Sequence, residues 1–89
     1  MLLEQDVRVV NRLGVHARPA ASIVQTVLNF ECEVHFLHNG ARINAKSIMG
    51  LLTLAATQGT IMKVICEGSD AEQAMVAVKQ LFANGFGEE

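Results

Sequence analysis

The chain has 89 residues, of which 51% are hydrophobic and 18% charged. This composition predicts a single compact domain over residues 1–89 rather than a disordered chain. Seven Lys and Arg against nine Asp and Glu give a net charge of −2, the basic residues are scattered, and Trp and Tyr are absent. A nucleic-acid-binding protein is disfavoured, because it needs a concentrated basic surface and aromatic side chains that stack on bases.

The cysteines and the N-terminus indicate the cellular compartment. Cys32 and Cys66 form neither a CxxC nor another metal-ligand spacing and fall in strand-like apolar runs, so we expect buried, reduced thiols and no metal site. Met1–Leu3 is followed at once by Glu4 and Asp6, so we expect neither a signal peptide nor a transmembrane segment. These features predict a cytoplasmic protein without membrane insertion.

The first third of the chain predicts one strand and one helix. Valines separated by polar residues predict a strand over residues 6–10. Residues 11–14 interrupt it, and apolar residues at helical spacing then predict a helix from 17 to about 29. Pro19 fits the first turn of that helix, because a backbone N–H there has no intrahelical acceptor to lose.

The middle of the chain predicts a hairpin and a short helix. Residues 32–38, CEVHFLH, alternate in polarity as a half-buried strand does. The dipeptide at 39–40, Asn-Gly, is a strong hairpin signal because both residues tolerate positive φ, and 41–45 would be the return strand. Ser47 is a candidate N-cap for an apolar helix over 48–56.

The last third predicts another strand, over residues 60–68, and a final helix with an apolar stripe. Either Ser69 with Glu72 or Asp70 with Gln73 would form a capping box at the start of that helix. The order β-α-β-β-α-β-α predicts an α+β domain with helices on one face of a mainly antiparallel sheet, and it leaves the strand order open.

The first two predicted helices carry more apolar surface than one sheet would cover. The first helix has a second apolar sector beside the one that would face the sheet, and the second helix is apolar around its whole circumference. An exposed apolar patch on a small domain indicates a protein-binding surface. The alternative is that neighbouring loops cover the surplus.

His16 and Arg18 lie at the start of the first predicted helix. The free N–H groups and positive dipole end of a helix suit a phosphate, and an arginine can add a charged donor. An imidazole can act as the nucleophile, whereas a metal would need more ligands, and His35 and His38 fall on opposite faces of a strand. This combination indicates phosphohistidine chemistry, against the ordinary alternative of a helix-entry histidine without special chemistry.

Three segments resemble one known family. NRLGVHARPAA at 11–21 resembles the active-site signature of HPr, the histidine phosphocarrier of the bacterial phosphoenolpyruvate-dependent sugar phosphotransferase system. NGARINAKSIMGLLTLAATQGT at 39–60 is similar to the second signature of that family, around its regulatory serine, and LFANGFGEE at 81–89 is similar to its C-terminal end. The match covers nearly the whole chain, and the two signatures together are highly specific.

The resemblance implies an HPr-like open-faced β-sandwich with a four-stranded antiparallel sheet and three helices on one face. It also implies a carrier rather than an enzyme, without a cofactor, in which His16 takes a phosphoryl group on Nδ1 from phosphorylated Enzyme I. The carrier then passes it to EIIA domains of sugar permeases. Arg18 would steady the phosphate together with the backbone N–H groups of Ala17 and Arg18. Ser47 matches the serine that HPr kinase/phosphorylase modifies in many bacteria, which makes that enzyme a further expected partner.

The resemblance places partner docking on the apolar surplus of the first two helices, and we expect the carrier to be a monomer. The expected docking residues are Ala17, Ala21, Gln25, Leu28, Ile48, Leu52 and Thr53. Some family members carry a basic docking helix, whereas Gln25 and Leu28 are uncharged, which leaves partner preference open. We expect disorder at 87–89. The tail runs past the last apolar contact, which leaves open any role of the terminal carboxylate near His16.

Two alternatives remain at this stage. One is a small-molecule-sensing regulatory domain of the βαββαβ kind, which would not need a histidine at the first helix start. The other is an HPr paralogue in a nitrogen-related phosphotransfer branch. The sequence does not say which sugars or permeases would be served.

Overall fold

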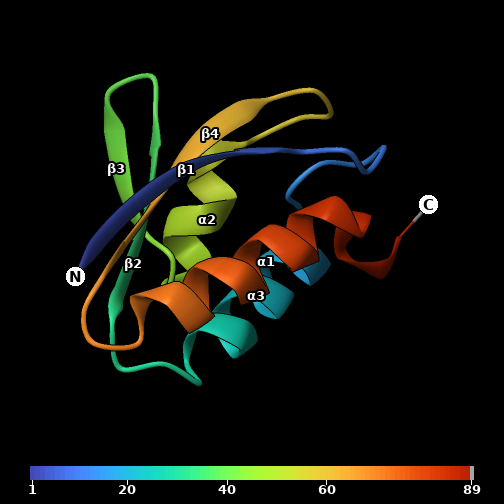
Figure 1. The fold of residues 1–89 in the computed structure, drawn as a ribbon. Coiled ribbons are helices and arrows are strands. Elements are labelled where there is room, and N and C mark those ends of the chain that lie inside the picture. The colour runs from blue at the N-terminus through green and yellow to red at the C-terminus, as the bar shows by residue number, and fades with distance from the viewer. Residues whose placement is uncertain (89) are drawn as a thin grey trace.

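The computed structural model describes residues 1–88 and consists of one antiparallel sheet with helices on one face (Figure 1). The strands are β1 (Leu2–Arg8), β2 (Glu33–His38), β3 (Ala41–Asn44) and β4 (Ile61–Glu67), in the sheet order β1-β4-β2-β3. The helices are α1 (Ala17–Val27), α2 (Ile48–Leu54) and α3 (Ala71–Ala83), followed by a short 3-10 turn, η1 (Gly85–Gly87). The predicted α+β open-faced sandwich is therefore confirmed.

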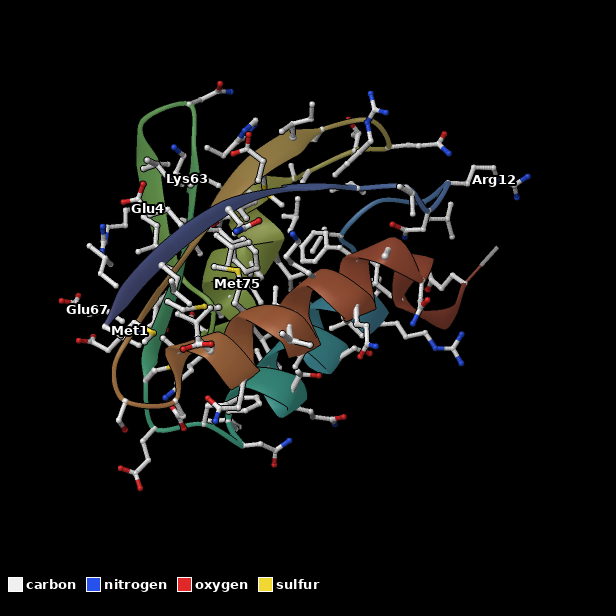
Figure 2. All side chains as sticks on the ribbon, viewed as in Figure 1. Met1, Glu4, Arg12, Lys63, Glu67 and Met75 are labelled. Atoms are coloured by element: carbon white, nitrogen blue, oxygen red, sulfur yellow. The ribbon has the colours of Figure 1, made fainter. Side chains whose placement is uncertain are left out.

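The alternation of polarity along the strands separates the two faces of the sheet. Val34 and Phe36 of β2 are fully buried against the helices. On β4, Lys63 alternates with buried neighbours and is exposed, and its ammonium lies 3.8 Å from the carboxylate of Glu4 on β1 (Figure 2). Only one face of the sheet is thus covered by helices, as an open-faced sandwich requires.

The first strand differs from the prediction. It begins at Leu2 and ends at Arg8, whereas the valine pattern predicted residues 6–10. The antiparallel register with β4 runs from the pair Leu2–Glu67 to the pair Arg8–Ile61, so the strand includes the polar residues 4–6 and the two leucines before them. Cross-strand hydrogen bonds, rather than side-chain polarity, set the bounds of this edge strand.

Of the helix caps predicted for α2 and α3, only the one at α2 is present. Ser47 caps α2 as expected, since its Oγ accepts a hydrogen bond from the backbone N–H of Gly50 at 3.0 Å. The capping box at α3 was wrong, because the N-cap residue Asp70 makes no side-chain cap hydrogen bond. Its carboxylate instead accepts hydrogen bonds from the backbone N–H groups of Glu31 at 2.8 Å and Cys32 at 2.9 Å, and so ties the start of α3 to the entry of β2.

A row of phenylalanines connects the sheet to the C-terminal end of the chain. The ring of Phe36 lies 5.6 Å from that of Phe82 on α3, and Phe82 makes an edge-on contact with Phe86 of η1 at 4.8 Å. All three side chains are buried. Aromatic pairs at these distances add to the stability of apolar burial, so the residues just after α3 are part of the core.

Both cysteines are buried and free, as predicted. Burial raises the pKa of the Cys66 thiol to about 11 and also raises that of Cys32. Among residues 1–88, no helix has the length and apolar character needed to cross a membrane. The same residues include no group of three His, Cys, Asp or Glu side chains placed to hold a metal ion.

Candidate functional site

The loop between β1 and α1 is fixed against the loop between α2 and β4. Val15 donates a backbone hydrogen bond to the carbonyl of Ala56 at 2.9 Å. Gly14 has φ of +71° and packs so closely that a Cβ there would overlap the carbonyl oxygen of Ala56. These contacts determine where the chain enters α1, and therefore where His16 lies.

His16 is the N-cap residue of α1, with extended backbone angles. Its carbonyl accepts the first helical hydrogen bond, from the N–H of Ala20 at 2.9 Å, but its side chain makes no cap hydrogen bond. The imidazole is therefore free of the usual capping role and is 37% exposed at the helix N-terminus. This agrees with the predicted location of the residue.

The imidazole contacts a carboxylate from the far end of the chain. Nε2 of His16 lies 2.9 Å from Oε2 and 3.1 Å from Oε1 of Glu88, whose side chain is 13% exposed. Asn11 donates through Nδ2 to Oε1 of Glu88 at 2.9 Å and to the carbonyl of Gly14 at 2.8 Å. Within residues 1–88, Nδ1 of His16 forms no hydrogen bond, so one ring nitrogen is held and the other is free.

The carboxylate of Glu88 is stabilised in its charged form. The hydrogen bond from His16 is the largest cause that lowers its pKa, and the amide of Asn11 and the charge of Arg18 lower it further. Desolvation acts in the opposite direction. Hydrogen bonds to a charged form favour that form, so at neutral pH this group is an ionised acceptor.

The predicted disorder at the C-terminus was wrong for Gly87 and Glu88. Gly87 belongs to η1, and the N–H of Glu88 donates to the carbonyl of Gly85 at 2.9 Å. The physical reason is Phe86, which takes a left-handed backbone with φ of 58° and buries its ring against Phe82. Glu89, with the terminal carboxylate, lies outside the described residues.

Glu88 was missed at the level of sequence. It is 72 positions from His16, and no local pattern predicts a contact over that separation. The available signal was indirect, namely an aromatic residue between two glycines just after an amphipathic helix. Such a residue can return the chain to the core and carry the next side chains with it.

Arg18 and the backbone around it have groups available to an anion. The side chain is exposed in the first turn of α1 and forms no ion pair with any residue in the described part of the chain. The backbone N–H groups of Ala17 and Arg18 belong to the first turn, where helical N–H groups have no intrahelical acceptor. Several donors are thus present in the first turn of α1, directly after His16 in the sequence.

The predicted docking residues lie on α1, on its C-cap residue Leu28 and on α2, and the two helices contact each other. Those that the structure leaves exposed are Ala17, Gln25, Leu28, Ile48, Leu52 and Thr53, and Ala21 is partly buried. Leu28 is 61% exposed, and Met49, which was not among the predicted docking residues, is 72% exposed. In contrast, Val24 of α1 is buried, so neighbouring elements cover part of the apolar surface that the sequence predicted to be exposed on this helix.

Comparisons with known proteins match nearly the whole chain. The family model described as "PTS HPr component phosphorylation site" matches residues 3–84. The phosphocarrier protein HPr of Xylella fastidiosa (strain Temecula1 / ATCC 700964) is 44% identical over 88 residues, which is 99% of each chain.

Solved structures of relatives give the same result. The crystal structure of HPr-C-His from Thermoanaerobacter tengcongensis matches with a TM-score of 0.93 and 40% identity, over 98% of each chain. A structure described as an HPr dimer from the same organism matches with a TM-score of 0.76 and 38% identity, over 92% of this chain and 94% of that one. The chain therefore belongs to the HPr family of phosphocarrier proteins of the phosphotransferase system.

Proposed function

We propose that this chain accepts a phosphoryl group on Nδ1 of His16 from phosphorylated Enzyme I and passes it to EIIA domains of sugar permeases. The observation that carries the proposal is the state of the His16 ring at the N-terminus of α1, with Nε2 bonded to Glu88 and Nδ1 without a hydrogen bond in residues 1–88. Membership of the phosphocarrier family supports the same assignment.

The transfer needs no cofactor. The Nδ1 lone pair attacks phosphorus, the N–P bond forms, and the bond from phosphorus to Enzyme I breaks, with its electron pair returning to Enzyme I. Charge on the phosphoryl oxygens during transfer would be stabilised by Arg18 and by the N–H groups of Ala17 and Arg18. In the second step a nucleophile of the EIIA domain attacks the same phosphorus, and His16 is the leaving group.

The partners would dock on the exposed residues of α1 and α2. Apolar side chains at the surface of both helices support this, because a small domain gains nothing by exposing them unless a partner covers them. We propose that the free carrier is a monomer in the cytoplasm, although one related HPr is described as a dimer. Light scattering at micromolar concentration measures this directly.

Ser47 is the proposed regulatory site, as a substrate of an HPr kinase where the host has one. The residue is partly exposed and stands directly before the exposed side chain of Ile48. A phosphate would add about −1.5 to −2 charges at pH 7 within the proposed docking surface. Regulation would then act through weaker binding of Enzyme I.

The experiment that tests the function is incubation with phosphoenolpyruvate labelled in its phosphoryl group and Enzyme I, followed by acid or base treatment of the product. Phosphohistidine survives base and is lost in acid, so we expect a base-stable label on the wild-type protein and no label on His16→Ala. A small-molecule-sensing domain would not be labelled at all. Parallel reactions with Enzyme I from carbohydrate and nitrogen-related branches distinguish the two kinds of carrier. Labelling of His16→Ala would contradict the assignment.

A further inference from the structure

The contact between Glu88 and His16 constrains the proton on the ring. Both carboxylate oxygens lie within hydrogen-bond distance of the same nitrogen, Nε2, at 2.9 and 3.1 Å. An ionised carboxylate only accepts hydrogen bonds, so Nε2 must carry a proton to make these contacts. In the neutral imidazole the lone pair then lies on Nδ1, because one ring nitrogen is the donor and the other the acceptor.

Glu88 is itself held in place from three directions. The side-chain amide of Asn11, which is only 2% exposed, donates to Oε1 of Glu88 and to the carbonyl of Gly14. The N–H of Glu88 is bonded to Gly85, and the preceding Phe86 is buried in the core. The carboxylate is therefore arranged before any partner binds and does not have to be recruited from solvent.

The orientation of the Asn11 amide follows from its neighbours. Its Nδ2 faces two acceptors, the carbonyl of Gly14 and the carboxylate of Glu88. Reversing the amide would direct an oxygen at both acceptors, which is electrostatically unfavourable. Asn11 thus supplies a fixed donor that leaves the other carboxylate oxygen to the imidazole.

We propose that Glu88 is a positioning residue that holds His16 as the Nε2–H tautomer and thereby presents the Nδ1 lone pair to the incoming phosphoryl group. This inference rests on the proposed function of His16 as phosphoacceptor. When the Nδ1–P bond forms and the bond from phosphorus to the donor breaks, the proton on Nε2 stays where it is. The ring becomes cationic at that moment, and the adjacent carboxylate of Glu88 stabilises the positive charge.

The alternative is that the contact only anchors the tail. Two readouts separate these roles, namely the tautomer of His16 and the rate at which it is phosphorylated. The ¹⁵N chemical shifts of the two ring nitrogens report the tautomer of the neutral ring in the free protein, without Enzyme I. Stopped or quenched reactions with phosphorylated Enzyme I report the rate.

Three variants are compared with wild type. Glu88→Ala removes the acceptor, Glu88→Gln removes the charge and replaces the oxygen that faces Nε2 with an NH2 donor, and Glu67→Ala is the control. Glu67 is an exposed carboxylate on β4, at the other end of the molecule from the C-terminus (Figure 2). Thermal melting of each variant confirms that it is folded under the conditions of the two measurements.

We expect the Nε2–H tautomer to predominate in wild type and in Glu67→Ala, and a mixture of tautomers in Glu88→Ala. In Glu88→Gln the amide oxygen accepts the hydrogen bond from Asn11, so the NH2 group faces Nε2 and shifts the ring toward the Nδ1–H tautomer. Phosphorylation of Glu88→Ala should be slower by about tenfold or more, as for other carboxylates that orient a functional imidazole. Glu88→Gln should be at least as slow as Glu88→Ala, because it lacks the charge and disfavours a lone pair on Nδ1.

The proposal is overturned if the Nδ1–H tautomer predominates in wild type, or if Glu88→Ala leaves either the tautomer or the rate unchanged. A slower Glu88→Ala with an unchanged tautomer would show that Glu88 only anchors the tail. Failure of the proposed function gives a different result, namely a wild-type protein that Enzyme I does not label at His16. The tautomer measurement is unaffected by that failure, so the two outcomes are distinguishable.

Discussion

At the scale of single residues, the candidate site consists of one imidazole, whose Nδ1 forms no hydrogen bond in residues 1–88, and of donors in the first turn of α1. His16 is fixed by its position as N-cap and by Glu88, whereas Arg18 has no ion-pair partner within the described chain. An unpaired guanidinium keeps its full capacity to bind phosphate. In the proposed function the two residues therefore have separable roles, attack by His16 and stabilisation of charge by Arg18.

Arg18→Ala should keep the fold but accept phosphate more slowly. A hydrogen bond to a charged group contributes roughly 1.5–3 kcal/mol, which corresponds to a rate lower by about tenfold to hundredfold. Quench-flow phosphorylation by Enzyme I measures the rate, with Arg42→Ala, on the exposed strand β3, as the matched control for loss of one positive charge. An unchanged rate in Arg18→Ala would assign the phosphate to the backbone N–H groups alone.

Gly14 is required for a different reason, which is space. Gly14→Ala meets both an unfavourable φ of +71° and the carbonyl oxygen of Ala56, whereas Gly40→Ala meets a similar φ of +81° with nothing within 4 Å. Backbone strain of this kind costs of order 1–3 kcal/mol, and both variants share it. Thermal melting should therefore show a larger loss of stability for Gly14→Ala, and equal losses would mean that packing against Ala56 is unimportant.

At the scale of elements, the N-termini of α2 and α3 are stabilised in different ways. Ser47 caps its own helix through Gly50, whereas Asp70 at the start of α3 binds the backbone of another segment. Capping within one helix depends only on local residues, whereas the contact of Asp70 with Cys32 requires the fold. Substitution of Ser47 should accordingly affect the start of α2 alone, whereas substitution of Asp70 should also loosen the contact between α3 and β2.

Ser47→Asp should fold normally but bind Enzyme I more weakly. The negative charge is favourable near the helix N-terminus, while next to Ile48 it disfavours burial against an apolar partner. Calorimetric titration of Enzyme I measures affinity, and Ser69→Asp, an exposed serine just before α3, controls for the added charge. The measured effect is a lower bound for phosphorylation, since aspartate carries less charge. Equal affinities of wild type and Ser47→Asp would place Ser47 outside the contact surface.

Asp70 makes stability depend on pH. The backbone N–H of Glu31 is the largest cause that lowers the pKa of Asp70. A lowered folded pKa means that the ionised carboxylate stabilises the fold above its ordinary pKa of about 4, and that this contribution is lost as the pH falls through the lowered value. The melting temperature of wild type should thus fall more steeply than that of Asp70→Asn between about pH 5 and pH 2.

The pKa of Glu88 is lowered too, so protonation of Glu88 also reduces the stability of the fold at acid pH. The comparison with Asp70→Asn isolates the contribution of Asp70, since Glu88 is present in both proteins. Parallel pH curves for wild type and Asp70→Asn would show that the tie between α3 and β2 does not depend on the charge.

At the scale of the whole molecule, the core seals off both cysteines. The pKa of Cys66 is raised to about 11 by burial, so almost no thiolate is present at neutral pH. A thiol reagent should therefore react slowly with the native protein, and the rate should rise in proportion to the unfolded fraction in denaturant. Fast labelling of the native protein would mean that the sheet opens locally around Cys66 without global unfolding.

The features of the fold and the candidate site that could be predicted from the sequence are those that depend on neighbouring residues. The turn at Asn39, the cap at Ser47 and the helix start at His16 each depend on residues a few positions apart, and all three have the predicted structure. The candidate site residues were predicted because histidine and arginine near a helix start have a defined chemistry toward phosphate, and their role stays a prediction.

The fold decided what depends on distant residues. The extent of β1 follows from its ladder with β4, and Asp70 gives up its local cap because the backbone of Cys32 lies within reach. Glu88 reaches His16 only because Phe86 packs into the core. Each of these contacts joins segments far apart along the chain, and local sequence pattern carries no information on which distant groups compete for a donor or an acceptor. The sequence by itself thus indicated His16 as the candidate phosphoacceptor, and the tertiary structure decided which nitrogen of its ring contacts a carboxylate from the far end of the chain.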